Sequence, residues 1–95
     1  MQVEDERIME KDNDVVIGTF WENNLDRIFG MNVMIFRKKR GMTQSELADK
    51  IGVTRSCIAS WEGGQRHPDL TILVRLSLVF NVGINELLEE NTYAN

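Results

Sequence analysis

The sequence contains one cysteine, one histidine and one proline among 95 residues, and these scarcities exclude several classes of structure. A single cysteine cannot form an intrachain disulfide, and one cysteine with one histidine cannot complete a structural zinc site. No apolar stretch exceeds a few residues, so we expect no transmembrane helix and no membrane partner. Residues 1–6 carry three acidic side chains and no basic one, which is the wrong charge for a secretory signal.

Residue groupings that carry catalysis are also missing from the sequence. We find no catalytic triad, no phosphate-binding glycine loop and no metal-ligand spacing, so we expect neither an enzyme nor a cofactor. The acidic pair Glu89 and Glu90 has no nucleophilic companion. Cys57 is interpreted as a half-buried small residue, and His67 as a turn residue or a neighbour of a phosphate.

The composition, with 42% hydrophobic and 27% charged residues, fits one small globular domain. The net charge of −4 argues at first against nucleic acid, but the charges are unevenly distributed. Residues 1–30 have a net charge of −5, residues 37–66 of +4 and residues 67–95 of −3. A basic middle between acidic ends is compatible with a surface that binds an anion.

Apolar spacing and helix-end residues predict an all-α fold of five short helices. Residues 1–14 are acidic and polar, and we interpret them as a flexible arm or a loosely held helix. A short β stretch remains open only for residues 15–17, which Gly18 follows. The first expected helix runs from Leu25 to the basic cluster before Gly41. The second and third cover residues 44–51 and about 55–62. The fourth runs from Asp69 through Phe80, and the fifth from about Gly83 through Leu88.

The second and third of these helices have the features of a tight helical pair. Thr43 and Glu46 have the spacing of a capping box at the start of one helix, and Thr54 can cap the next. Gly52 permits the positive φ that a sharp turn requires, while Ala48 allows close approach. Apolar side chains fill the wedge between the helices: Leu47, Ile51, Val53, Ile58 and Trp61. This is the construction of a helix-turn-helix, whose second helix can enter the major groove of DNA.

The stretch of about residues 29–90, two thirds of the chain, resembles the Xre family of Cro and lambda-repressor-type helix-turn-helix domains. The resemblance lies in Arg37, residues 41–48, residues 52–56, Ile58, Trp61, Glu62, Gly64, Pro68, Leu73, Leu76, Phe80 and residues 86–88. It implies a five-helix lambda-repressor-like domain, bacterial or phage, cytoplasmic and nucleoid-associated. It also implies a dimeric repressor that binds double-stranded DNA at a partly palindromic operator.

The resemblance further implies roles for individual residues. Bases would be contacted by Thr54, Arg55, Ser56 and Ser60. Phosphates would be contacted by Gln44, Gly64, Gln65 and Arg66. Arg37 and Glu62 match positions that form a partly buried structural ion pair. The residues agree with these roles, because the Arg55 guanidinium can donate two hydrogen bonds to guanine and free amides near Gln44 favour a phosphate.

Apolar side chains outside the core suggest a second surface. Met31, Met34 and Ile35 on the first helix and Ile72 and Leu78 on the fourth lie at positions that are usually polar in the resembled pattern. Exposed together, these side chains would form an apolar patch, which soluble monomers generally avoid. Our hypothesis is that residues 15–30 fold back onto this patch or exchange onto it across a dimer.

We therefore expect three segments: an acidic extension (1–28) that packs partly on the domain or on a partner, the helix-turn-helix domain (29–90) and a tail (91–95). Two alternatives to a repressor remain. One is an antitoxin-type regulator whose residues 1–30 hold a protein partner, and the other is a protein-interaction module that reuses the fold without binding DNA.

Overall fold

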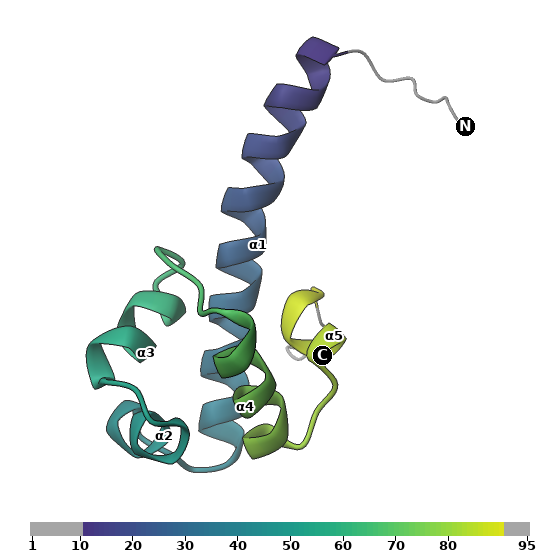
Figure 1. Cartoon of the computed structure of the whole chain (residues 1–95). Coiled ribbons are helices and arrows are strands. Elements are labelled where there is room, and N and C mark those ends of the chain that lie inside the picture. The colour runs from purple at the N-terminus through teal and green to yellow at the C-terminus, as the bar shows by residue number, and fades with distance from the viewer. Residues whose placement is uncertain (1–10, 91–95) are drawn as a thin grey trace.

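The computed structural model describes the backbone of residues 11–90 and the side chains of residues 24–90. Five helices make up this part of the chain, which contains no strand (Figure 1). They are α1 (Lys11–Lys39), α2 (Gln44–Ile51), α3 (Arg55–Glu62), α4 (Leu70–Phe80) and α5 (Ile84–Leu88). The predicted all-α, five-helix fold is confirmed. No helix among the described residues is long and apolar enough to cross a bilayer.

The predicted starts of α2, α3 and α4 are confirmed at atomic detail. Thr43 accepts from the Glu46 amide, and the Glu46 carboxylate accepts from the Thr43 amide, which completes the capping box of α2. Thr54 and Asp69 cap α3 and α4 in the same way, each by accepting from the amide three residues on. Gly52 adopts the left-handed φ of 80° expected for the turn between α2 and α3.

The first helix is much longer than the sequence predicts. It begins at Lys11 rather than near Leu25, so the open possibility of a β stretch at residues 15–17 is wrong. A single glycine inside a helix costs only about 1 kcal/mol relative to alanine, which explains why Gly18 does not end the helix. Residues 11–23 project from the rest of the molecule and are called the α1 arm below (Figure 1). Residues 1–10 and 91–95, the rest of the expected arm and the tail, lie outside the described part.

The core lies where α1 crosses the other four helices. Phe29, Val33 and Phe36 of α1 are buried against side chains of every other helix. These partners are Leu47, Ala48, Ile51, Ile58, Trp61, Leu76, Phe80 and Leu87. Arg40, directly after the end of α1, donates to the Phe80 carbonyl. Its guanidinium lies over the Phe36 and Phe80 rings and covers this end of the core. The C-terminal half of α1 is thus the axis of the domain.

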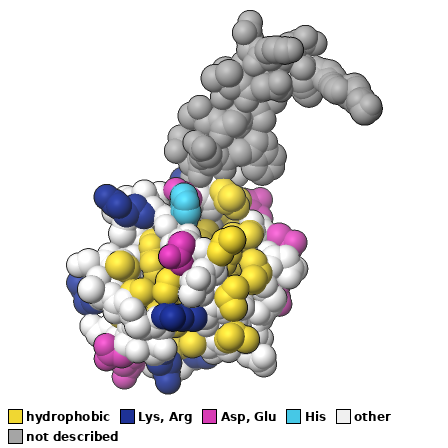
Figure 2. Space-filling model, viewed as in Figure 1, with side chains coloured by type: hydrophobic (Ala, Val, Ile, Leu, Met, Phe, Trp, Pro, Cys, Tyr) yellow, Lys and Arg dark blue, Asp and Glu magenta, His cyan; other side chains and the backbone are white. Residues whose placement is uncertain are grey.

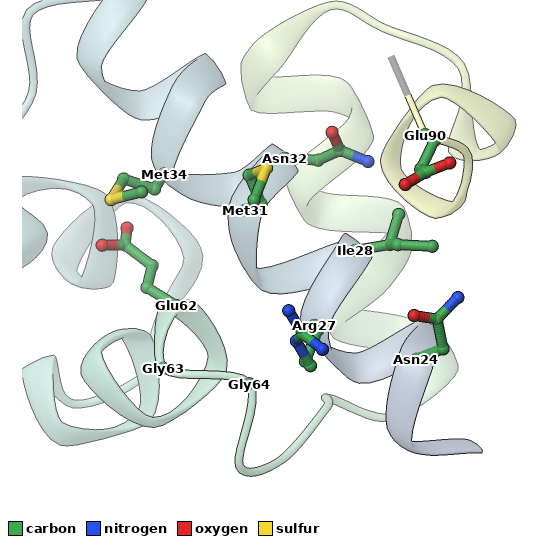
Figure 3. A pocket seen from close by; sticks show the side chains of 10 residues that line it. All are labelled: Asn24, Arg27, Ile28, Met31, Asn32, Met34, Glu62, Gly63, Gly64 and Glu90. Atoms are coloured by element: carbon green, nitrogen blue, oxygen red, sulfur yellow. The ribbon is translucent and has the colours of Figure 1, made fainter. Parts of the chain in front are cut away.

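The closest approach between α1 and α3 occurs at Gly30. A Cβ atom added there would lie 2.0 Å from the Trp61 carbonyl oxygen. A hollow of about 280 Å³ opens next to this contact, between α1 and the end of α3. Figure 3 shows its lining, with Met31, Arg27 and Glu90 around the mouth and Gly63 and Gly64 at one side.

The expected apolar patch is only partly present. Met31 is 55% and Leu78 is 73% exposed, but Met34, Ile35 and Ile72 are half-buried, and Ile72 packs against the core. Apolar side chains do gather elsewhere, on the face where α4 and α5 lie (Figure 2). Leu70, Val74 and Leu78 are exposed there along one side of α4.

The fold-back of residues 15–30 is also wrong. These residues belong to one unbroken helix that continues to Lys39, and a helix cannot return onto its own outer face without a turn. Among the side chains that the structure describes, those at the base of this segment pack on the domain, where Phe29 is buried and Asp26 pairs with His67. The alternative form of the hypothesis, exchange across a dimer, stays a prediction.

We predict that Gly30→Ala destabilises the domain. The added methyl group would overlap the Trp61 carbonyl, and such overpacking costs about 1–3 kcal/mol, more than the helix-propensity gain of about 1 kcal/mol. Urea unfolding followed by circular dichroism measures the change in free energy. Gly63→Ala is the matched control, because φ there is −81° and the nearest atom lies 3.3 Å from the added carbon. Equal stability of the two variants would contradict the proposed close approach.

Candidate nucleic-acid interface

Helix α3 has a buried side and an exposed side. Ile58 and Trp61 are buried in the core, and the Trp61 ring packs edge-on against Phe29. Arg55 and Ser56 are exposed, whereas Ser60 is half-buried. Arg55 and Ser56 therefore present their side chains to solvent in the first turn of α3, and Ser60 lies one turn further along, partly covered. Among the described residues, Arg55 forms no ion pair, so its guanidinium can bind a partner outside the chain.

Thr54 is placed differently from the other three candidates. Its hydroxyl oxygen accepts from the Cys57 amide at 3.3 Å, and its hydroxyl donates to the Cys57 sulfur at 3.4 Å. The oxygen therefore caps the helix. The half-buried position expected for Cys57 is confirmed. Thr54 stands at the exposed start of α3, but its polar group is already used within the chain.

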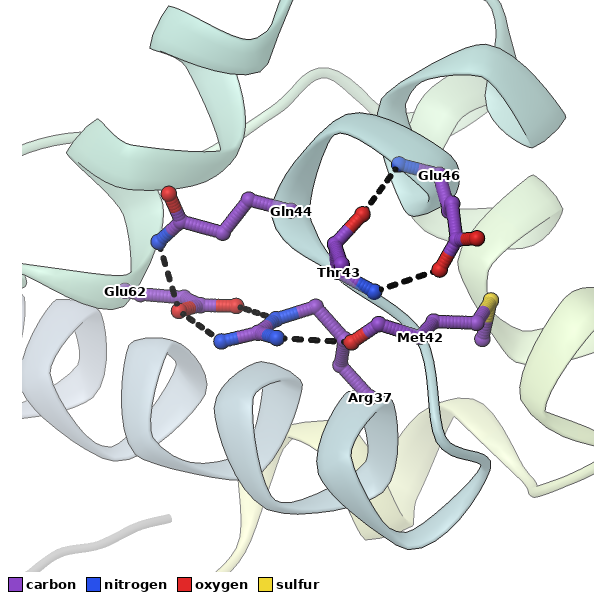
Figure 4. A network of polar contacts seen from close by, with 6 residues as sticks. All are labelled: Arg37, Met42, Thr43, Gln44, Glu46 and Glu62. Atoms are coloured by element: carbon purple, nitrogen blue, oxygen red, sulfur yellow. Dashed lines mark hydrogen bonds and ion pairs between the residues drawn. The ribbon is translucent and has the colours of Figure 1, made fainter.

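A buried ion pair joins α3 to α1. Arg37 donates from Nε to Glu62 Oε2 at 2.6 Å and from a terminal nitrogen to Oε1 at 3.0 Å (Figure 4). The side chains of Arg37 and Glu62 are only 10% and 6% exposed. This is the pairing that the resemblance implies, in the bidentate geometry that fixes both position and orientation.

Two further groups complete this network. The other terminal nitrogen of Arg37 donates to the Met42 carbonyl at 2.8 Å, and the Gln44 side-chain amide donates to Glu62 at 3.0 Å. Figure 4 shows the three segments meeting at the Glu62 carboxylate. Hydrogen bonding to Glu62 raises the pKa of Arg37, against a smaller opposing effect of burial. Because this pKa is raised, an increase in pH removes the stabilising contribution of Arg37 only above the ordinary arginine value.

The loop after α3 holds the remaining candidates at the surface. Gly64 adopts φ of 75°, its amide donates to Trp61, and the Gln65 amide donates to Ser60. These two bonds form a Schellman motif, which satisfies the last carbonyls of the helix. Gln65 and Arg66 are exposed beyond it. Because Gln44 at the start of α2 bonds to Glu62 at the end of α3, the start of α2 lies beside the end of α3 and the loop that follows it.

Sequence reasoning missed two contacts that shape this region. His67 Nδ1 lies 2.9 Å from Asp26 Oδ1, which ties the loop to the base of the α1 arm. The Gln44 to Glu62 bond was also missed, because Gln44 was considered only as a phosphate ligand. Asp26 and His67 are 41 positions apart in the sequence, and no pattern links the two. No cluster of metal-binding side chains occurs in the described part of the chain.

Comparison with known proteins gives a consistent family assignment. A family model described as helix-turn-helix matches residues 33–87. The HTH-type transcriptional regulator SinR of Bacillus subtilis is 36% identical over 64 residues, 66% of this chain and 58% of SinR. The uncharacterized HTH-type transcriptional regulator YqaE of the same species is 36% identical over 62 residues, 65% of this chain and 53% of YqaE. The chain thus spans little more than half the length of these two relatives.

Solved structures show the same similarity. The restriction-modification controller protein C.AhdI from Aeromonas hydrophila superposes with a TM-score of 0.61 at 29% identity, over 65% of this chain and 94% of that protein. The hypothetical transcription factor NHTF from Neisseria reaches 0.68 at 23% identity, over 77% of this chain and 84% of that one, and shares the fold.

We predict that Arg37→Met lowers the free energy of unfolding by about 3–5 kcal/mol, because it leaves the Glu62 carboxylate buried without its cation. The double variant Arg37→Met/Glu62→Met removes both charges and should lose less than the sum of the two single variants. Urea unfolding of the four proteins in this double-mutant cycle gives the coupling. Strictly additive losses would show that Arg37 and Glu62 do not depend on each other.

Proposed function

Because this chain belongs to the Xre-like helix-turn-helix family, we propose that it is a transcriptional regulator that binds double-stranded DNA with α3 in the major groove. The observation that carries the proposal is the arrangement around Glu62. One side of α3 is fixed by the Arg37 pair, and the opposite side presents Arg55 and Ser56 to solvent. A rigidly held helix with a free guanidinium is suited to reading base edges.

Phosphate contacts would set the position of α3 on the duplex. Gln44 stands at the first position of α2, where helix amides favour an anion. One hydrogen of its side-chain nitrogen already goes to Glu62, so its backbone amide and the second hydrogen of that nitrogen are left to donate to a phosphate. The loop that follows α3, with Gly64 at its turn and Gln65 and Arg66 exposed, would contact a second stretch of the DNA backbone.

Base recognition rests mainly on Arg55. Its guanidinium can donate to guanine O6 and N7 together, which is worth about 1–3 kcal/mol of discrimination. Ser56 and Ser60 can bond to several bases and would refine the preference. Thr54 would contribute through its methyl group or position, since its hydroxyl caps α3. We further propose that a homodimer places two copies of α3 on a partly palindromic operator in the nucleoid and represses by occluding a promoter.

We predict that the full chain enriches a two-fold-symmetric site from a random duplex pool, with half-sites about one helical turn apart. Arg55→Ala should relax the preference at one base pair of each half-site, at a cost of about 1–3 kcal/mol per contact. Arg55→Lys is the matched control for charge, because it keeps the cation but lacks the guanidinium fork. Its overall affinity for DNA should fall less than its preference for the correct base pair.

A second variant separates phosphate contacts from base contacts. Arg66→Ala should weaken binding to all sequences alike and lower the slope of log affinity against log salt by about 1. Fluorescence anisotropy across a salt series measures this slope. Failure to enrich any site at low salt would contradict the DNA-binding function and favour a protein-interaction module.

A further inference from the structure

The side chain of Arg27 on α1 packs against the turn that follows α3. A Cβ atom added at Gly64 would lie 3.1 Å from Arg27 Cγ and 3.4 Å from Arg27 Cα. Figure 3 shows both residues at the hollow between α1 and the end of α3. The missing side chain of Gly64 thus makes room for the aliphatic stem of Arg27, which carries its guanidinium beside the turn.

The base of the α1 arm and the loop after α3 form one surface. Asp26, the neighbour of Arg27 in sequence, holds the loop at His67 through a contact of 2.9 Å. Two successive residues of α1 therefore contact residues 64 and 67, on either side of Arg66. Both Arg27 and Arg66 are exposed. Two guanidinium groups thus extend from neighbouring segments of this surface.

The positive charge of Arg27 is not neutralised by the side chains that the structure describes. Arg27 forms no ion pair with any of them. Two acidic groups of this region already have partners within the chain, because Glu62 binds Arg37 and Asp26 contacts His67. The guanidinium of Arg27 is therefore open to an anion from outside the chain.

The turn after α3 has few hydrogen-bond donors of its own for a phosphate. The amides of residues 63–65 all donate to carbonyls of α3. An anion at this turn must therefore be bound mainly by side chains. Gln65 and Arg66 provide donors from the loop, and the guanidinium of Arg27 provides a fork of N–H donors from α1.

We infer that Arg27 is a further phosphate contact of this chain, and that it binds the DNA phosphate next to the one that Arg66 contacts. This inference rests on the proposed DNA-binding function and extends it. The DNA-contacting residues that the resemblance implies all lie between positions 44 and 66, and the family model matches residues 33–87. Arg27 precedes that match, so the long first helix of this chain adds to the DNA-contacting surface.

The salt dependence of DNA binding tests the contact. Each phosphate neutralised on B-DNA contributes about 0.9 to the slope of log affinity against log salt. Arg27→Gln should lower the slope by about this amount for each chain bound, because it removes the cation and keeps most of the stem beside Gly64. Arg27→Lys should restore the slope, since an ammonium group also binds phosphate. Fluorescence anisotropy on a duplex enriched from the random pool measures these slopes.

Ethylation interference on the same duplex identifies the phosphate itself. Ethylation removes the charge of one phosphate at a time, and the positions where it blocks binding mark the contacts. Arg27→Gln should lose one interference position in each half-site, and Arg66→Ala should lose the neighbouring position. A cation that acts only from a distance would weaken binding and leave every position in place, which would contradict the proposed contact.

Glu90→Gln is the matched control, because it changes the charge of the same hollow. Glu90 is exposed and lines the hollow together with Arg27. Its carboxylate accepts hydrogen bonds but offers no donor to a phosphate. Glu90→Gln should therefore keep every interference position and bind DNA at least as tightly as the wild-type chain. Circular dichroism melts establish that each variant is folded.

The outcomes separate this inference from the proposed function. If the wild-type chain binds the duplex and Arg27→Gln changes neither the slope nor the interference pattern, the inference is overturned and the function stands. Loss of the same interference position in Glu90→Gln would also overturn the inference, because the donor of Arg27 would then not be its cause. A wild-type chain that binds no duplex at low salt would overturn the function and the inference with it.

Discussion

Three segments of the chain meet at the Glu62 carboxylate. Arg37 of α1 binds both of its oxygens, and Gln44 of α2 donates to one of them. Arg37 also holds the Met42 carbonyl in the connection between α1 and α2. Because a buried carboxylate without its cation is strongly destabilising, these bonds restrict α1, the start of α2 and the end of α3 to one arrangement. The orientation of α3 follows from this constraint.

The proposed interface depends on that orientation. Gly30 lets α3 approach α1 until the backbones nearly touch, and Ile58 and Trp61 fill the remaining space. With its inner side fixed, α3 presents Arg55 and Ser56 outward, and the Schellman turn at Gly64 leads into the exposed residues Gln65 and Arg66. The Asp26–His67 contact extends the constraint to the base of the α1 arm.

Much of this was predictable from sequence, because helix ends are set by local chemistry. Thr43 with Glu46, the glycine at 52 and the cap at Asp69 each act within a few residues. The helical structure of residues 11–24 was harder to predict from sequence, because their charges and Gly18 obscure the helical pattern. This part of α1 continues into the well-packed part of the same helix. Gln44 bonding to Glu62 and Asp26 meeting His67 depend on how the helices cross, which no local pattern encodes.

The central claim is that α3, held in place by the Arg37–Glu62 pair, presents a DNA-binding surface. A ¹⁵N-edited NMR titration of the full chain with an enriched duplex tests this claim residue by residue. The account predicts the largest amide shift changes at Gln44, at residues 54–60 and at residues 64–66, with little change along α4 and α5. Changes concentrated on α4 and α5, with α3 unaffected, would contradict it.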